Sequence, residues 1–231
     1  MPKSGRDAPL AWSLNSTLRP QRVQSWDCRL CQNHPRLAPL DVSQCKKVRD
    51  LSALSQLHGL KVLDISSCPP ITDLRPMAGL TGLVRLNAEG CGGVSNLQPL
   101  SGLTRLTVLD LGRMEGIVDL RPLTELQQLE FLSLRECKNA REAAEVTGKM
   151  PRLKGLCLPP GLTDGELASV CERHTNLVLL GLCGCRKITS LAALRKIAGL
   201  KVLRMDIYIG LTDAEIATFK KDIPGCRIQE H

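Results

Sequence analysis

Leucine and other aliphatic residues recur along most of the chain in the pattern L-x-x-L-x-L. The pattern first occurs at residues 37–42 and returns eight times, and its first position advances by 23 or 24 residues each time. The first positions of the nine copies are Leu37, Leu60, Leu83, Leu106, Leu129, Leu153, Leu177, Leu200 and Ile223. A fixed period of this length indicates an array of small units that bury their apolar residues against one another.

Within each unit the alternation of apolar and polar residues predicts a short β-strand, because side chains two residues apart lie on the same face of a strand. The leucines then point into a shared core. The ninth position of most units is a small or flexible apolar residue: Cys45, Cys68, Cys91, Met114, Cys137 and Cys185. We expect these thiols to lie inside the stack and to donate weak hydrogen bonds to loop carbonyls.

The segments that return from one strand to the next are of two kinds. Pro76, Pro99 and Pro122 predict tight helical turns, since proline is tolerated in the first turn of a helix. Residues 163–166 and 212–215 both match a capping box and predict longer helices in the later units. Phe219 and the ninth strand are expected to seal the end of the stack.

These features resemble the leucine-rich repeat family, whose consensus is the framework L-x-x-L-x-L-x-x-N/C. The second to fourth and the seventh units look like its short, SDS22-like class, and the cysteines look like those of its cysteine-containing class. The resemblance covers residues 37–231. It implies an α/β solenoid of about nine units of 23–24 residues, with a parallel β-sheet on the concave face and short helices and turns on the convex face.

Composition suits one such domain. Of 231 residues, 43% are hydrophobic, 41 are leucine and only 2% are aromatic. This apolar fraction excludes a disordered chain, and the longest apolar stretch, Leu177–Cys185, is about half the ~20 residues that a membrane-spanning helix needs. We divide the chain into a basic N-terminal arm with a capping helix, residues 1–36, and a repeat solenoid with its C-terminal cap, residues 37–231.

The formal net charge of +8 is unevenly placed. Residues 1–36 carry six basic and two acidic side chains, residues 37–130 carry nine and ten, and residues 131–231 carry sixteen and eleven. The two ends are therefore basic and the middle is nearly neutral. This distribution favours acidic surfaces of protein or nucleic acid as partners, although charge that only aids solubility is the simpler interpretation.

Most of the eleven cysteines occupy repeat positions, and no hydrophobic signal region follows Met1. We therefore expect free thiols in a reducing intracellular compartment rather than a disulfide framework. The cytoplasm is the first choice, and the mitochondrion, the cilium and the nucleus are alternatives. The Arg- and Ser-rich start of the chain leaves a mitochondrial transit peptide open.

The arm is expected to cover the first unit, because an open solenoid exposes an apolar cross-section. Val23, Trp26 and Leu30 share one face of a short predicted helix, which makes Trp26 a cap residue. Trp12 either extends this cap or contacts a partner, since tryptophan is frequent at binding interfaces. The arm residues assigned to such a contact are Trp12, Arg19 and Arg22.

The sequence offers little catalytic chemistry. Cys28, Cys31 and His34 form C-x2-C-x2-H, but zinc prefers four ligands and Cys45 already has a place in the core, so packing in the cap is the simpler interpretation. No H-E-x-x-H, G-x-S-x-G or G-x-x-x-x-G-K-[ST] motif occurs. We expect a non-enzymatic protein with no cofactor, no metal and no small-molecule substrate.

The register of the repeat places two stripes of side chains on the concave face, since adjacent strands lie about 4.8 Å apart. The first comes from the third position of each unit: Pro39, Val62, Arg85, Val108, Phe131, Gly155, Leu179, Val202 and Gly225. The second comes from the fifth position: Asp41, Asp64, Asn87, Asp110, Ser133, Cys157, Gly181, Arg204 and Arg227.

The first stripe is mostly apolar and is expected to face solvent, which suggests a contact surface with Phe131 as its central anchor. The second stripe runs from acidic to basic. Its aspartates either await a cationic partner or hydrogen-bond nearby loop groups, and both interpretations stay open. The predicted partner-binding residues are Val62, Asp64, Arg85, Val108, Asp110, Phe131, Arg135, Leu179, Val202 and Arg204.

The leading hypothesis is a non-catalytic protein–protein interaction scaffold, a subunit of a larger intracellular assembly, that binds a protein on its concave face. One alternative is a ribonucleoprotein subunit, as in a mitochondrial ribosome, whose basic arm binds RNA. Others are an axonemal or ciliary structural protein and, by analogy with cysteine-containing relatives, a ubiquitin-ligase substrate adaptor. No membrane partner is expected.

Overall fold

All strands of the computed structural model belong to one parallel sheet. The structure describes residues 21–22, 39–138, 142–206 and 210–230. Within them the spatial order of the ten strands is their order in the chain. The strands are β1 (Gln21–Arg22), β2 (Leu40–Asp41), β3 (Val62–Asp64), β4 (Arg85–Asn87), β5 (Val108–Asp110), β6 (Phe131–Ser133), β7 (Gly155–Cys157), β8 (Leu179–Gly181), β9 (Val202–Met205) and β10 (Arg227–Glu230). The predicted α/β solenoid with a parallel sheet is confirmed.

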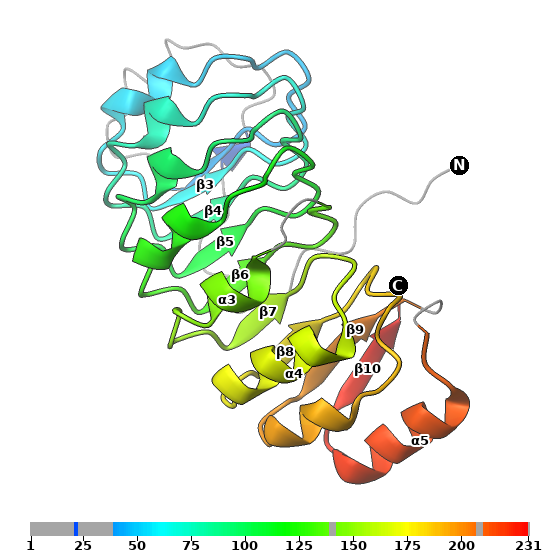
Figure 1. The fold of residues 1–231 in the computed structure, drawn as a ribbon. Helices are drawn as coiled ribbons and strands as arrows, with labels where there is room; N and C mark the ends of the chain where they lie inside the picture. The colour runs from blue at the N-terminus through cyan, green and yellow to red at the C-terminus, as the bar shows by residue number, and fades with distance from the viewer. Residues whose placement is uncertain (1–20, 23–38, 139–141, 207–209, 231) are drawn as a thin grey trace.

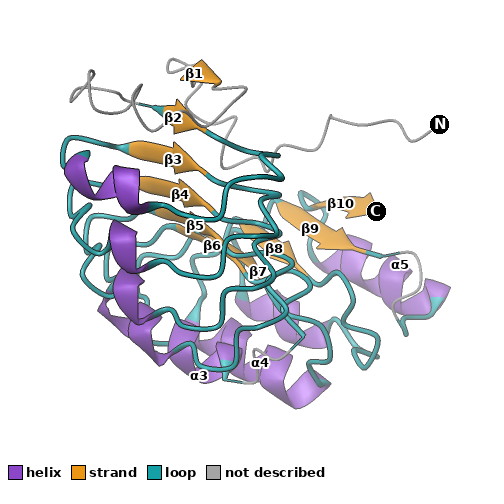
Figure 2. Cartoon of the chain, turned by 90° about the horizontal axis from the view of Figure 1, so that it is seen from above, coloured by secondary structure: helices purple, strands orange, loops and turns teal. Residues whose placement is uncertain are grey.

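The chain forms an arc, with the strands along its inner side and the helical segments along its outer side (Figures 1 and 2). The early units return through 3-10 helices and several later ones through α-helices. The 3-10 helices are η1 (Ser52–Gln56), η2 (Arg75–Met77), η3 (Gln98–Leu100), η4 (Arg121–Glu125) and η5 (Ala192–Lys196). The α-helices are α3 (Ala143–Thr147), α4 (Asp164–Arg173) and α5 (Asp213–Asp222).

The predicted helix starts are found where the sequence placed them. Proline lies in the first turn of η2, η3 and η4, where its missing N–H costs no hydrogen bond. Thr163 and Glu166 form a complete capping box at the start of α4. At α5 one half of the box is present: the Thr212 hydroxyl accepts a hydrogen bond from the Glu215 backbone N–H at 3.2 Å.

The leucines of the repeat form one continuous buried core that runs from β2 to the last unit. The ninth-position thiols line it and donate to carbonyls of the preceding unit over 2.9–3.3 Å, as in Cys91 to Ile65. Burial raises the pKa of Cys91, Cys137 and Cys185 to about 12 and that of Cys68 to about 11. The structural role predicted for these thiols is confirmed; Cys45, in the first unit, is only half-buried.

The chain leaves most strands through a residue with left-handed backbone at the eighth position of the unit. Gly90 and Gly184 occupy it in two units, at φ of 75° and 78°. Side-chain-bearing residues adopt the same conformation at Gln44, Ser67, Arg113 and Glu136, with φ of 55–62°. In the sixth unit this position is Pro160, whose ring fixes φ at a negative value, and the left-handed residue is Gly161 instead.

The ninth unit differs from its predicted register. Arg227 pairs with Val202 and Gln229 pairs with Arg204, so β10 lies two residues out of phase with the periodic alignment. The return segment before it contains the ten-residue α5, which uses more residues than a 3-10 turn. Arg227 therefore belongs to the first concave stripe, and Gln229, not Arg227, follows Arg204 in the second.

The two ends of the stack are closed differently. At the C-terminal end Phe219 is 3% exposed and packs on the core, as expected. At the N-terminal end β1 adds a strand to the sheet, with Gln21 opposite Leu40. The other residues assigned to the cap, the arm contact and the candidate zinc ligands lie outside the described residues: Trp12, Arg19, Val23, Trp26, Cys28, Leu30, Cys31 and His34.

Candidate interaction surface on the concave face

The sheet brings the predicted concave residues into adjacent rows. The register pairs Val62 with Arg85, Arg85 with Val108, Val108 with Phe131, and so on along the arc through Gly155, Leu179 and Val202. The neighbouring row contains Asp64, Asp110, Cys157 and Arg204. Up to β9, therefore, both stripes are continuous across the inner face.

Five residues near the middle of this face form a second apolar cluster that is separate from the main core. Phe131, Cys157 and Leu179 are 6%, 5% and 7% exposed, and Val108 and Val202 are half-buried against them. We call this set the concave apolar cluster (Val108, Phe131, Cys157, Leu179, Val202). It lies on the predicted face and in the predicted part of the arc.

The side chains of the cluster lie against the sheet and do not project from it as an exposed anchor would. A Cβ at Gly155 would lie 2.5 Å from Cδ2 of Phe131, and a Cβ at Gly181 would lie 2.8 Å from Sγ of Cys157. The ring and the thiol therefore lie over glycines of the next strand. The expectation that the first stripe faces solvent is wrong for Phe131, Leu179 and Val62, which is 8% exposed.

The aspartates of the second stripe bind their own turns. Oδ1 of Asp41, Asp64 and Asp110 accepts a hydrogen bond from the backbone N–H two residues later, over 2.8–2.9 Å. Asn87 makes the same contact at 3.1 Å and also donates to Oδ2 of Asp64. Of the two interpretations left open by the sequence, these contacts support local hydrogen bonding.

Burial perturbs these carboxyls. Desolvation raises the pKa of Asp110 to about 6 and opposes the hydrogen bond from Gly112, which lowers it. Desolvation also raises the pKa of Asp64, where Asp41 adds repulsion. Both carboxyls are therefore costly to ionise in this position, which argues for a structural role in the turn.

Arg135 is held in place from two repeats away. Its Nη2 lies 2.7 Å from Oε1 of Glu89, and the intervening unit contributes Gly112 to the same row. Arg135 and Glu89 retain 35% and 24% of their side-chain exposure. On the C-terminal side Nε of Arg204 donates to Oε1 of Gln229 at 3.1 Å. Arg85 is half-buried between Val62 and Val108.

The cysteines on this face are poor nucleophiles. Burial raises the pKa of Cys157 to about 12 and also raises that of Cys183, whereas a reactive thiol needs a lowered pKa. Within the described ranges no three His, Cys, Asp or Glu side chains are placed to hold a metal ion, and none of the helices described is long and apolar enough to cross a bilayer.

Comparison with solved structures places the fold. An internalin (inlF) from Listeria monocytogenes superposes with a TM-score of 0.54 at 21% sequence identity, over 84% of this chain and 68% of that one. The chain has the fold of a leucine-rich repeat solenoid. An internalin C2 from the same species has a TM-score of 0.44 at 25% identity (74% and 64% covered), and a leucine-rich repeat protein of Leptospira interrogans has 0.38 at 18% (77% and 62%).

This leucine-rich repeat chain spans under two thirds of the length of the last two structures. No protein-family model and no curated protein matches it. At these identities the likeness concerns the fold alone, so the function has to come from the chain's own surfaces.

Two features of the concave face do not follow from the sequence prediction. Glu89 and Gly112 stand at the seventh position of their units, the row that also contains Arg135, and a stripe drawn through that position would have found them. Gly155 and Gly181 were placed on the concave face, but their effect on Phe131 and Cys157 was not foreseen. A glycine next to a large side chain in the same stripe indicates that the large side chain can lie over the glycine.

Proposed function

We propose that this leucine-rich repeat chain is a non-catalytic scaffold that binds a protein partner on its concave face, as a subunit of a larger intracellular assembly. Repeat solenoids present an extended concave surface suited to that purpose. The observation that carries the proposal is the concave apolar cluster, which lies at mid-arc and is separate from the main core.

The shape of the cluster suggests which side supplies the anchor. Because Phe131 and Cys157 lie over glycines, the cluster forms an apolar floor with Val108 and Val202 half-buried at its margins. A floor of this kind receives a protruding apolar side chain rather than providing one. Arg204 and the exposed Arg227 follow on the C-terminal side, so a partner with acidic residues next to its anchor fits best.

The experiment uses the half-buried margins, because a charge at the buried Phe131 would destabilise the fold. Val108→Lys and Val202→Lys in the full chain should each abolish capture of the main partner in affinity purification with mass spectrometry. Val118→Lys is the matched control, since Val118 is 63% exposed in the segment between β5 and η4. This variant should retain the partner.

Circular dichroism and thermal unfolding serve as the control that all three variants are folded. A partner that still binds both concave variants, or that is lost equally from Val118→Lys, would move the site away from the concave face. Purification with nuclease separates this proposal from a ribonucleoprotein, because a protein partner held by the cluster stays bound after the nucleic acid has been digested.

A further inference from the structure

The last four units carry an uneven distribution of charge along one edge of the solenoid. This edge is where each return helix ends and the next strand begins. The cations on it are exposed, and the described residues give none of them an ion pair. We call this set the basic edge: Lys149, Arg152, Arg173, Lys201, Lys220 and Lys221.

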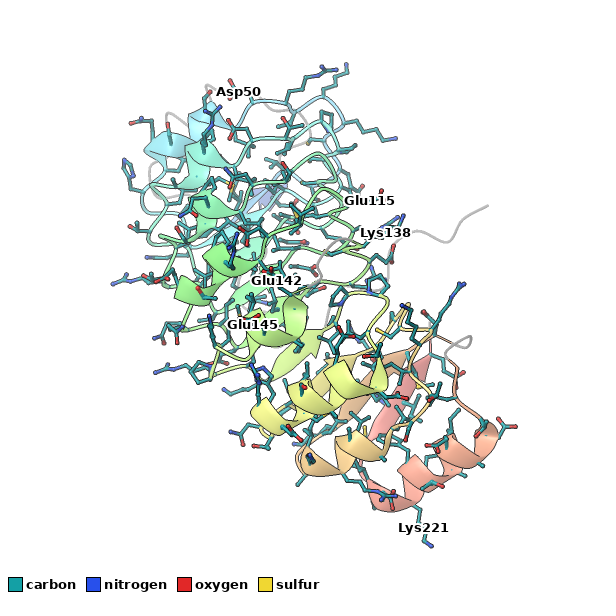
Figure 3. The ribbon with its side chains drawn as sticks, viewed as in Figure 1. Asp50, Glu115, Lys138, Glu142, Glu145 and Lys221 are labelled. Atoms are coloured by element: carbon teal, nitrogen blue, oxygen red, sulfur yellow. The ribbon has the colours of Figure 1, made fainter. Side chains whose placement is uncertain are left out.

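The edge is defined by the place of each residue in its unit, in the last turn of the return helix or between that helix and the next strand. The strand-start residues form a row in which the N–H of Val178 donates to Lys154, that of Lys201 to Val178, and that of Arg227 to Lys201. The helix ends form a second row, in which the Arg173 guanidinium lies over Gly148, directly beside Lys149. Lys221, labelled in Figure 3, extends from the end of α5 away from the body of the protein.

Three acidic residues in the same units form ion pairs with cations that do not belong to the basic edge. Glu130 pairs with Lys154 at 3.1 Å, Glu172 with Lys196 at 2.6 Å, and Asp222 with Arg195 at 2.6 Å. These three ion pairs do not involve the six cations of the basic edge. Glu145, on α3, lies four residues before Lys149 and is an acidic neighbour in the chain.

Helix dipoles explain only part of this pattern. Arg173, Lys220 and Lys221 lie in the last turns of α4 and α5, where a cation is favourable. Arg152 and Lys201 lie beyond the helix ends, at the start of the next strand, and the dipole effect does not extend that far. A row of like charges that the fold does not require points to a polyanionic ligand.

We propose that the basic edge binds the phosphodiester backbone of a nucleic-acid duplex. Four units spaced by about 5–10 Å extend the edge over roughly 15–30 Å, less than one turn of a duplex of ~34 Å. Both aromatic residues of the described ranges, Phe131 and Phe219, are buried, so this surface offers no ring for base stacking. Contacts to phosphates alone read no sequence. This surface is distinct from the concave face and does not depend on a partner there.

The test measures binding of fluorescent duplexes of about 20 base pairs, under two helical turns, by anisotropy across a salt series. The full chain is compared with Arg152→Gln/Lys201→Gln/Lys220→Gln. Each lost phosphate contact removes about 0.9 from the slope of log K against log salt, so the triple variant should lose about 2 to 3. At about 0.1 M salt its affinity should fall on the order of tenfold to a hundredfold.

Lys46→Gln/Lys47→Gln/Arg49→Gln is the matched control, with the same change in charge at exposed positions between β2 and η1. It should keep the wild-type slope. RNA and DNA duplexes are tested separately, since either could supply the phosphodiester backbone. Weaker binding of either duplex by the triple variant supports the site. If both variants weakened duplex binding equally, the effect would come from net charge alone, and the proposal would be overturned. Equally tight binding of a poly-glutamate peptide would overturn it in favour of an acidic protein.

Discussion

Arg135 and Glu89 form an ion pair of 2.7 Å across an entire repeat unit. The intervening unit has Gly112 in the same row: a Cβ there would be in ordinary contact with Cγ of Glu89, at 3.5 Å, and in tighter contact with Oδ1 of Asp110, at 3.1 Å. The guanidinium also stabilises the ionised carboxyl of Asp110. One cation thus links three consecutive units on the concave side.

Arg135→Gln should lower the free energy of unfolding by about 1 kcal/mol at neutral pH, the upper range for a partly exposed pair. The reason is that Glu89 loses its partner while Asp110 loses a favourable charge. Urea denaturation measures the change. Arg113→Gln is the control: Arg113 pairs with Glu136 at 3.5 Å and is 60% exposed, so its loss should be smaller. An equal loss of unfolding free energy in the two variants would show that the Arg135–Glu89 pair stabilises the protein no more than an exposed pair does.

Asp110→Asn should stabilise the protein at pH 8 and leave it unchanged at pH 4. Burial raises the pKa of Asp110 to about 6 from an ordinary value near 4. At pH 4 the folded carboxyl is neutral and the unfolded one has only begun to ionise, so the penalty is small. It grows as the pH rises from about 4 to 6, where the unfolded chain is ionised and the folded carboxyl is not, and it is complete above pH 6. The gain at pH 8 should be on the order of 1–3 kcal/mol, measured by denaturation at both pH values.

The asparagine is expected to fit, because Asn87 accepts the equivalent backbone hydrogen bond one strand away. Asp73→Asn gives a control of opposite sign. Arg75 lowers the pKa of Asp73, so its replacement should destabilise the protein at pH 8 rather than stabilise it. If the effect of Asp110→Asn on stability did not depend on pH, the raised pKa of the buried Asp110 carboxyl would be contradicted.

Gly155→Ala should destabilise the solenoid by about 1–3 kcal/mol, because the new methyl would overlap the Phe131 ring. In a Phe131→Ala background the same change should cost much less, and the difference is the coupling energy of a double-mutant cycle. Gly79→Ala is the control, since nothing lies within 4 Å of its Cβ position. Independent, additive effects at residues 155 and 131 would mean that the ring does not lie over the glycine.

The repeat period alone was enough to predict the sheet, the core and the ninth-position thiols, since each depends on phase and on the apolar character of a position. Contacts between side chains on the concave face depend on the sizes of the side chains at adjacent positions of a stripe. The repeat period carries no information about these sizes. Phe131 was therefore placed on the correct face but with the wrong exposure. The register of β10 differs from the prediction for a related reason: α5 lengthens its unit, and Ile228 fits an apolar position in both alignments.

The remaining prediction concerns His174, which occupies a core position that is apolar in neighbouring units. Leu126, Met150 and Ile197 are the equivalent residues, and all three are fully buried. His174 is 4% exposed, and its Nε2 has no hydrogen-bond partner among the described residues. Burial lowers the pKa of His174, and a hydrogen bond to the backbone of Thr147 opposes this only in part.

Because the folded pKa lies below the unfolded value of about 6.5, the unfolded chain takes up the proton first as the pH falls. The free energy of unfolding should therefore decline below pH 6.5, and His174→Leu should remove this decline. At pH 8 the substitution should be neutral or stabilising by up to about 1 kcal/mol, since it replaces an unsatisfied buried nitrogen by an apolar group. Urea denaturation at pH 8 and pH 5 gives the comparison. Met150→Leu should leave the wild-type pH dependence intact, and an unchanged pH profile in His174→Leu would exclude His174 as its source.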